Sequence, residues 1–232
     1  MLPKPTIYPE EQFSQAVAQR VISALQKGIT ECDQAVWVVA GGSTFTAVYS
    51  LLASEQYCNQ VEWQKVHILF GDERCVPPTN PDSNFAAFTQ AFTRKDPVIH
   101  RILAELSLQE TIADYEQVLA HNKQPFDVVL LGIGSDGHTA SIFPSLLPDM
   151  QSHQYQIAEC AKPDLPPFVP RITLGFAALA NSRQVLVCAA GKSKTPIIRA
   201  LANDTQGIYP ASHIYCQNGS VELLIDTQAA TM

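Results

Sequence analysis

Short apolar runs alternate along the chain with segments whose apolar residues recur at helical spacing. The runs are continuous rather than confined to every second residue, which is typical of strands covered on both faces of a sheet. The predicted strands are residues 35–40, 66–70, 127–134, 171–175, 184–191 and 213–216. Helices are predicted at residues 11–27, 83–92, 111–122 and 193–201, and a further helix begins after Ser43 or Thr44, which would cap it. Gly28 is expected to end the first of them.

This alternation predicts an α/β fold. We expect a doubly wound, mostly parallel sheet with helices on both faces, because a strand followed by a helix returns to a parallel neighbour through a right-handed crossover. No Pro-, Gly- or Ser-rich linker divides the chain, although residues 163–170 form a stiff, proline-rich loop, so residues 1–232 are expected to form a single domain. Ligands of such sheets bind outside the carboxyl ends of the strands.

The residues after the first predicted strand, Gly41 to Thr44, are suited to an anion. Backbone N–H groups at the start of a helix, uncrowded by Cβ atoms, bind anions, and two hydroxyls add donors. A tight turn with a capping hydroxyl would use the same residues, and both interpretations stay open. The segment is neither a Walker A loop nor a G-x-G-x-x-G motif.

Asp72 and Arg74 belong to a charged triplet directly after the next strand. A solvated loop with an internal ion pair is one interpretation. However, Pro77 and Pro78 stiffen the loop and would hold the charged side chains in fixed directions. A guanidinium held in this way can donate two hydrogen bonds to a carbonyl, carboxylate or phosphate group.

The segment GIGSDGHTASIFP, residues 132–144, follows the clearest buried strand. Its glycines indicate a close approach of the backbone to another group. Asp136 and His138 lie in one turn, and Thr139 is expected to begin a helix behind them. Because an imidazole titrates near physiological pH, a histidine in a Gly-rich loop at the carboxyl edge of a sheet suits a general base. We therefore predict a catalytic role for His138.

Further cations stand near two later strands. Lys192 and Lys194 lie at the start of the helix predicted at 193–201, where the helix dipole disfavours positive charge. A bound anion would resolve this conflict, whereas a role in surface solubility is the alternative. Arg171 opens the strand after the proline-rich loop and is either a ligand of an anion or a structural residue.

Composition excludes several classes of protein. A formal net charge of −7 argues against a nucleic-acid or anionic-membrane partner, so a locally placed cation is informative. The six cysteines stand singly, without zinc-ligand spacing or the density of a disulfide framework, and no metal site is predicted. No apolar stretch reaches the roughly 18 residues of a membrane span, and no signal peptide is recognised, so we expect a cytoplasmic protein.

Taken together, these clusters resemble the 6-phosphogluconolactonase family. GIGSDGHTASIFP and DERCVPPTNPDSN are the specific motifs, and the resemblance extends over most of the chain, from Gly41 to Lys194, in the order of the family. It implies a Rossmann-like fold and hydrolysis of 6-phospho-D-glucono-1,5-lactone in the oxidative pentose phosphate pathway. It implies no cofactor and no metal, and a small sugar-phosphate lactone as the partner.

The resemblance also implies roles for residues. His138 takes the place of the general base of the family, and Arg74 matches the arginine of its D-E-R motif, which binds the lactone near the reacting carbonyl. Arg171 and Lys194 match a strand-opening arginine and the lysine of a late Gly-x-x-Lys motif, both expected to bind phosphate.

The remaining candidates support these four residues. Gly42, Ser43 and Thr44 would add donors to the phosphate. Asp136 is expected to orient the imidazole, and Asp72 to position a sugar hydroxyl.

The chain departs from the family pattern at a few positions. Phe45 stands where the family often has proline, and Gly175-Phe176 replaces a more usual Thr-containing stretch. Lys192 is an additional cation that could share the role of Lys194.

Two alternatives use the same kind of fold. One is an amino-sugar phosphate isomerase or deaminase, but that family has D-E-Y in place of D-E-R and an Asn-Glu-Pro run where this chain has Ser141 to Pro144. The other is a sugar-phosphate-binding regulator without catalysis, for which a DNA-binding segment is expected and none is recognised. The sequence leaves the oligomeric state open and is compatible with a monomer.

Overall fold

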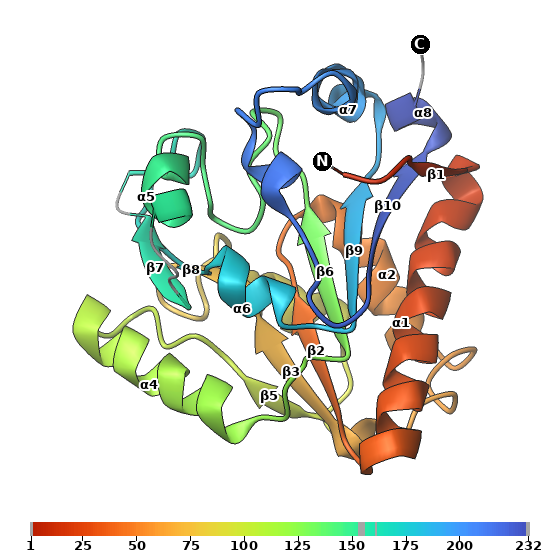
Figure 1. Ribbon diagram of the computed structural model, residues 1–232. Helices are drawn as coiled ribbons and strands as arrows, with labels where there is room; N and C mark the ends of the chain where they lie inside the picture. The colour runs from red at the N-terminus through yellow and green to blue at the C-terminus, as the bar shows by residue number, and fades with distance from the viewer. Residues whose placement is uncertain (1, 153–155, 161, 231–232) are drawn as a thin grey trace.

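The protein is built around a parallel sheet, seen in a computed structural model that describes residues 2–152, 156–160 and 162–230. The seven strands lie in the order β1-β10-β9-β6-β2-β3-β5, and every pair is parallel (Figure 1). The strands are β1 (Thr6–Tyr8), β2 (Ala35–Val39), β3 (Val66–Phe70), β5 (Val98–His100), β6 (Val128–Gly132), β9 (Gln184–Ala189) and β10 (Ser220–Asp226).

The order in which the chain adds strands reverses in the middle of this sheet. From β2 the chain proceeds outward to β3 and β5, and it then returns to β6 on the other side of β2 and proceeds to β9 and β10. The sheet is therefore doubly wound, as predicted, and the crevice between the ends of β2 and β6 is the place where such folds bind ligands.

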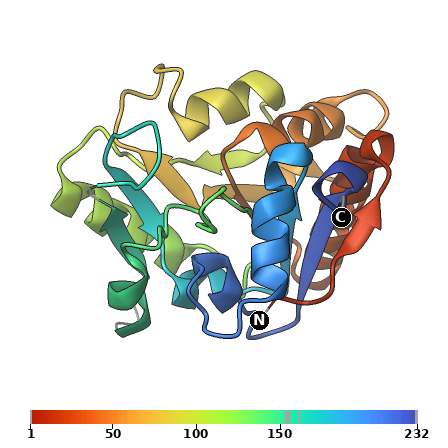
Figure 2. The ribbon, with the colours of Figure 1, turned by 90° about the horizontal axis from the view of Figure 1, so that it is seen from above.

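Helices cover both faces of the sheet. Figure 2, which looks down on the carboxyl ends of the strands, shows α2 and α3 on one side and α6 on the other. The helices are α1 (Glu10–Cys32), α2 (Ser43–Ala53), α3 (Asn84–Ala91), α4 (Leu108–His121), α5 (Leu147–Ser152), α6 (Phe176–Ala180), α7 (Thr195–Ala202) and α8 (Thr227–Ala230). The described residues also form the 3₁₀ turns η1 (Trp63–Lys65), η2 (Lys192–Lys194) and η3 (Pro210–His213).

A small antiparallel sheet stands beside the carboxyl edge of the large one. Its strands β4 (Asp72–Arg74), β8 (Arg171–Leu174) and β7 (Ile157–Cys160) lie in the order β4-β8-β7. The strand predicted at 171–175 thus forms, but in this second sheet. Its position brings the charged triplet after β3 next to the residues that follow the proline-rich loop.

The core fills the space between the sheet and its helices. All five residues of β2 are buried, which explains their continuous apolar run. Trp37 in this strand contacts aromatic rings from the helix side, with ring-centroid distances of 5.7 Å to Tyr49, 6.3 Å to Trp63 and 5.9 Å to Phe92. Such edge-on and tilted contacts stabilise cores beyond the burial of apolar area.

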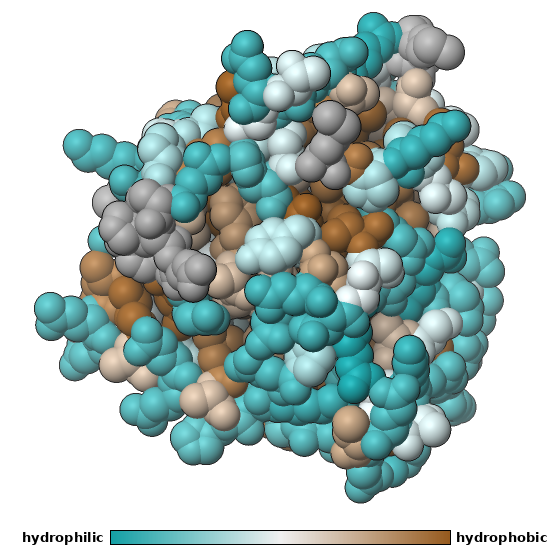
Figure 3. Space-filling model, in the orientation of Figure 1, coloured by the Kyte–Doolittle hydropathy of each residue, from teal (hydrophilic) through white to brown (hydrophobic). Residues whose placement is uncertain are grey.

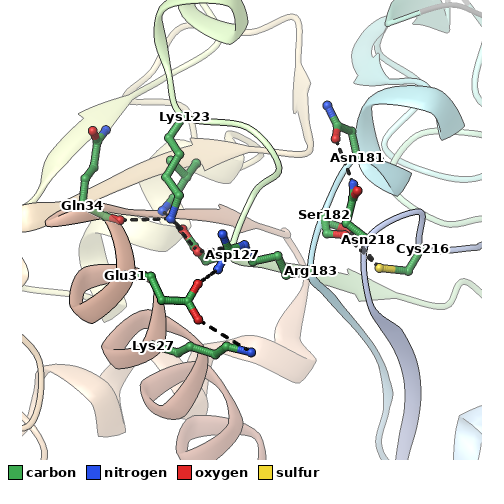
Figure 4. A network of polar contacts seen from close by, with 11 residues as sticks. Lys27, Glu31, Gln34, Lys123, Asp127, Asn181, Ser182, Arg183, Cys216 and Asn218 are labelled. Atoms are coloured by element: carbon green, nitrogen blue, oxygen red, sulfur yellow. Dashed lines mark hydrogen bonds and ion pairs between the residues drawn. The ribbon is translucent and has the colours of Figure 1, made fainter.

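The prediction that Gly28 ends the first helix is wrong. Helix α1 continues to Cys32, and Asp33 ends it in the left-handed conformation. Gly28 is instead a point of close approach, because a Cβ atom there would lie 2.5 Å from Asp127 Oδ1. The carboxylate of Asp127 accepts hydrogen bonds from the Val36 amide and Lys123 Nζ, and lies in a polar network with Arg183 (Figure 4).

The prediction of a last strand at 213–216 is also wrong, since His213 ends turn η3 and residues 214–216 have no strand structure. The last strand is β10, whose amino-terminal half is exposed or half-buried. Because exposed and buried residues are mixed in β10, the strand does not form a continuous apolar run.

Two predicted helix starts differ as well. Gly42, with φ 96°, is the N-cap of α2, and neither Ser43 nor Thr44 caps the helix with its side chain. No helix begins at Thr139; that residue forms a bridge with Ile142 around Ala140, which has a φ of 48°. The backbone amide of Ser141 donates to Thr173 Oγ1 at 3.1 Å, and this contact fixes the turn in place of a helix.

On the side of the molecule shown in Figure 3, hydrophilic residues predominate and hydrophobic ones form separate patches. Isolated apolar residues are normal on protein surfaces. Within the described part of the chain, every helix is too short or too polar to span a bilayer.

Candidate active site

The residues after β2, β3, β6 and β9 meet at the carboxyl edge of the sheet. They surround a cavity of about 280 Å³, to which Leu165 and Pro166 of the proline-rich loop also contribute. Most residues predicted for the site line this cavity: Gly42, Ser43, Thr44, Asp72, Arg74, His138, Arg171 and Lys194. Segments more than a hundred residues apart in the sequence are thus brought together.

His138 is oriented by Asp136. Its Nδ1 lies 2.6 Å from Asp136 Oδ1, which also accepts the backbone amide of His138 at 3.1 Å. Burial alone would raise the pKa of Asp136, but the hydrogen bond and charge of His138 and two backbone amides lower it below its ordinary value. An ionised carboxylate only accepts hydrogen bonds, so Nδ1 of His138 carries the proton that points to Asp136.

The glycines of this loop are required by its close packing. A Cβ atom at Gly134 would lie 2.0 Å from His138 Nδ1, and Gly137 has a φ of 82°. A Cβ atom at Gly137 would also lie 2.6 Å from the ring of Tyr209. The Gly-rich sequence therefore serves to hold the imidazole and the carboxylate tightly against their own backbone.

Arg74 and Arg171 are direct neighbours on the antiparallel strands β4 and β8. Arg171 donates to the carbonyl oxygens of Leu165 and Pro167, and Arg74 Nη1 donates to Asp82 O at 2.5 Å. Neither guanidinium forms an ion pair with a residue in the described ranges, and the Nε atom of each is buried without a hydrogen-bond partner there. Burial and the charge of Arg74 lower the pKa of Arg171. Two adjacent guanidinium groups without a direct ion pair in the described ranges favour a bound anion.

Asp72 connects β4, on which it lies, to the start of α3 and to the loop that follows β6. Its Oδ1 accepts from Asn84 Nδ2 at 3.1 Å and its Oδ2 from the Ser141 hydroxyl at 2.5 Å. With 5% of its surface exposed, the carboxylate lines the cavity but already has two protein donors. Its expected role toward a sugar hydroxyl stays a prediction.

Two further residues of the site are not evident from the sequence pattern: Glu73, which supports it, and Asn84, which lines the cavity. The buried carboxylate of Glu73 accepts the backbone amides of Arg74, Asn84 and Phe85 and the hydroxyl of Ser83. It thereby joins the arginine-bearing strand to the start of α3. The pattern that could have revealed this function is an acid next to Arg74 followed by a helix start with Ser at its N-cap.

The two lysines of the late motif differ in position. Lys194 donates to the Ile133 carbonyl at 2.7 Å and lines the cavity. Burial lowers the pKa of Lys194, an effect that the charge of Asp136 partly offsets. Lys192 is exposed and lies outside the cavity lining. Both belong to the turn η2, which precedes α7, so the two side chains leave the backbone in different directions.

The start of α2 supplies the other wall. Its first turn, Ser43 and Thr44, faces the cavity, and Gly41 packs so closely that a Cβ atom would lie 2.0 Å from Asn84 Oδ1. Free N–H groups at a helix start favour a negatively charged ligand. No group of three or more His, Cys, Asp or Glu in the described ranges is placed to hold a metal ion.

This arrangement is that of an α/β protein with a polar site at the switch point of a parallel sheet, where one imidazole lies beside three cations and a helix start. Residues 9–224 match the family model described as glucosamine-6-phosphate isomerases/6-phosphogluconolactonase. The chain belongs to this family.

Several similar proteins are 6-phosphogluconolactonases. A 6-phosphogluconolactonase of Thermotoga maritima is 30% identical over 84% of this chain and 87% of its own length. The protein named 6-phosphogluconolactonase 3 of Saccharomyces cerevisiae (strain ATCC 204508 / S288c) is 34% identical over 82% and 79%. The crystal structure of the Thermotoga maritima enzyme superposes with a TM-score of 0.82 at 29% identity, covering 97% of this chain and 100% of that one. The resemblance to the 6-phosphogluconolactonases is thus confirmed.

Proposed function

We propose that the protein hydrolyses 6-phospho-D-glucono-1,5-lactone to 6-phospho-D-gluconate. The observation that carries the proposal is the cavity that His138, with its Nδ1 held by Asp136, shares with Arg74, Arg171 and Lys194. A base for water and cations for a phosphate in one cavity match the two chemical features of this substrate. The relatives named above are 6-phosphogluconolactonases.

In the proposed reaction, His138 Nε2 takes a proton from water while the water oxygen attacks C1 of the lactone. The carbonyl electrons move to the oxygen, and the guanidinium of Arg74 and backbone N–H groups stabilise the oxyanion, by roughly 3–4 kcal/mol for a well-placed donor. When the carbonyl re-forms, the C1–ring oxygen bond breaks and the imidazolium of His138 protonates that oxygen. A δ-lactone is an activated ester, so the scheme needs no metal or covalent intermediate.

The phosphate end of the substrate is assigned to Arg171 and Lys194, with donors from Ser43 and Thr44. Their role would be to hold the lactone so that C1 faces His138, since correct orientation lowers the barrier of a bimolecular step. Lys192 lies outside this set and would act only through its charge.

The test is the rate of acid release when fresh lactone is mixed with the protein, compared with the spontaneous rate. We expect a His138→Ala variant to lose about 10²–10⁴-fold in kcat, and Arg171→Ala mainly to raise KM. Acid release at the spontaneous rate with the wild-type protein would overturn the proposal. Ammonia release from glucosamine 6-phosphate, measured in parallel, would instead indicate the isomerase branch of the family.

A further inference from the structure

The ring of Phe143 contacts two residues of the site, His138 and Arg171. Its centroid lies 4.3 Å from that of His138, with the two ring planes 33° apart, and the Cζ atom of Arg171 lies 5.0 Å over the same ring. Phe143 is completely buried and is not part of the cavity lining. It therefore supports the site from behind and would not touch a bound substrate.

The hydrogen bonds of His138 and Arg171 do not by themselves fix the planes of the two groups. Asp136 holds His138 at Nδ1, which fixes one atom of the imidazole but allows the ring to tilt about that contact. Arg171 is held at Nη2 by two carbonyl oxygens, and its Nε has no partner in the described ranges. A flat surface packed against each group restricts the tilt that the hydrogen bonds permit.

We propose that Phe143 is a positioning residue whose one ring sets both the plane of the catalytic imidazole and that of the phosphate-binding guanidinium. The inference rests on the proposed function for the roles of His138 and Arg171. Because both groups pack on one rigid ring, the distance between the base and the phosphate is fixed through Phe143. The attraction between a cation and an aromatic face adds to the packing of Arg171.

The test compares Phe143→Leu with Phe126→Leu. Phe126 is equally buried, with 1% of its surface exposed, and lies just before the start of β6, whereas Phe143 follows the end of this strand. Both changes remove a core ring, so both should lower the melting temperature. We expect only Phe143→Leu to lower kcat, by about 10-fold or more, and to weaken binding of 6-phosphogluconate by about 5-fold.

A double-mutant cycle separates positioning from loss of core packing. In an Arg171→Ala background, Phe143→Leu should weaken 6-phosphogluconate binding by less than about twofold, because the guanidinium that the ring holds is gone. An unchanged 5-fold effect in this background would overturn the role toward Arg171. Calorimetry of the four proteins gives the required dissociation constants.

A spectroscopic measurement tests the role toward His138 without relying on activity. The ring current of Phe143 should shift the imidazole proton resonances of His138, which a His138→Gln variant assigns. The shift should be lost in Phe143→Leu and kept in Phe126→Leu. If both variants keep it, or if kcat falls equally in both, Phe143 is only a core residue. A wild-type protein that shows the shift but does not accelerate lactone hydrolysis would overturn the proposed function and leave the ring contact standing.

Discussion

At the scale of single residues, the site depends on how closely one loop packs upon itself. The side chains of His138 and Asp136 pack closely against the backbone of Gly134. The carboxylate of Asp136 accepts hydrogen bonds from both the ring and the backbone amide of His138. Changes of a single atom or a single charge should therefore alter catalysis while the fold persists.

Gly134→Ala is expected to reduce activity strongly. The added methyl group would lie 2.0 Å from His138 Nδ1 and 2.6 Å from Asp136 Oδ1, so the contact between the imidazole and the carboxylate must be displaced. A displacement of about 1 Å at a reacting group costs roughly 10²-fold in rate. The matched control is Gly132→Ala, whose nearest neighbour, an atom of the Phe45 ring, lies at an ordinary 3.6 Å. Steady-state kcat and thermal melting of both variants check the prediction, which fails if the two retain equal activity.

Asp136→Asn should lower kcat by about 10²-fold with little effect on KM. The amide keeps the shape of the side chain but lacks the charge that stabilises the imidazolium formed when His138 takes the proton from water. It can also donate to Nδ1, which would favour the tautomer with the proton on Nε2. Steady-state kinetics with the lactone measure both constants. A rise in KM alone would show that Asp136 acts in binding rather than in orienting the base.

At the scale of elements, the loop between β3 and α3 is held by a buried acid rather than by an ion pair. The four donors on Glu73 connect β4, which carries Arg74, to the first turn of α3. Burial raises the pKa of Glu73, although the three backbone amides counteract this effect. The carboxylate thus fixes the position of a proposed catalytic arginine without neutralising it.

Glu73→Gln should lower the free energy of unfolding by about 2–3 kcal/mol, because an amide nitrogen cannot accept the bonds that one carboxylate oxygen accepts. Urea denaturation provides the measurement. A suitable control is Glu105→Gln, which removes a partly exposed pair with Arg101 and should cost less than about 1 kcal/mol. Equal losses in the two variants would contradict a special role of Glu73.

The same scale shows what the sequence could and could not predict. Buried parallel strands such as β2 and β3 are visible as continuous apolar runs, and their ends are the places where the site residues stand. Strand β10 is not visible in this way because only its second half is buried. The extent of α1 is not predictable locally, because Gly28 is required by a close contact with Asp127, about a hundred residues away, and not by the end of the helix.

The candidate site was predictable for a related reason. Residues such as His138 and Lys194 lie in Gly-containing turns after strands, and parallel topology alone brings such turns together. The sequence does not reveal the residues that hold them in place. In the sequence, Phe143 is an ordinary apolar residue and Glu73 is part of a charged loop. Supporting contacts depend on distances between elements, which the spacing of residues along the chain does not encode.

At the scale of the whole molecule, the sheet contains a titratable pair that is independent of the site. His67 on β3 and His100 on the edge strand β5 stack with ring centroids 5.2 Å apart, and Nδ1 of the first lies 2.9 Å from Nε2 of the second. One nitrogen must donate and the other accept, so at least one ring has to be neutral. The contact between His67 and His100, which joins β3 to β5, is therefore most stable at a pH at which the imidazoles are neutral.

This pair should make the fold less stable as the pH falls below about 6.5, the ordinary pKa of histidine. Burial lowers the pKa of His67, although Asn122 opposes the effect, and burial and the charge of His67 lower the pKa of His100. Between the ordinary and the lowered pKa the unfolded chain binds more protons, so protonation favours unfolding. Above pH 6.5 this contribution to stability is fully present, and below the lowered pKa values it is lost.

The measurement is the free energy of unfolding from urea titrations between pH 8 and pH 5, for the wild type and for His100→Gln. Other groups also titrate in this range, but they are shared by the two proteins, so the difference between the two curves isolates the pair. We expect the wild type to be the more stable protein at pH 8 and its advantage to shrink toward pH 5, because the glutamine cannot be protonated. A difference that stays constant over this range would show that the stacked histidines do not couple folding to pH.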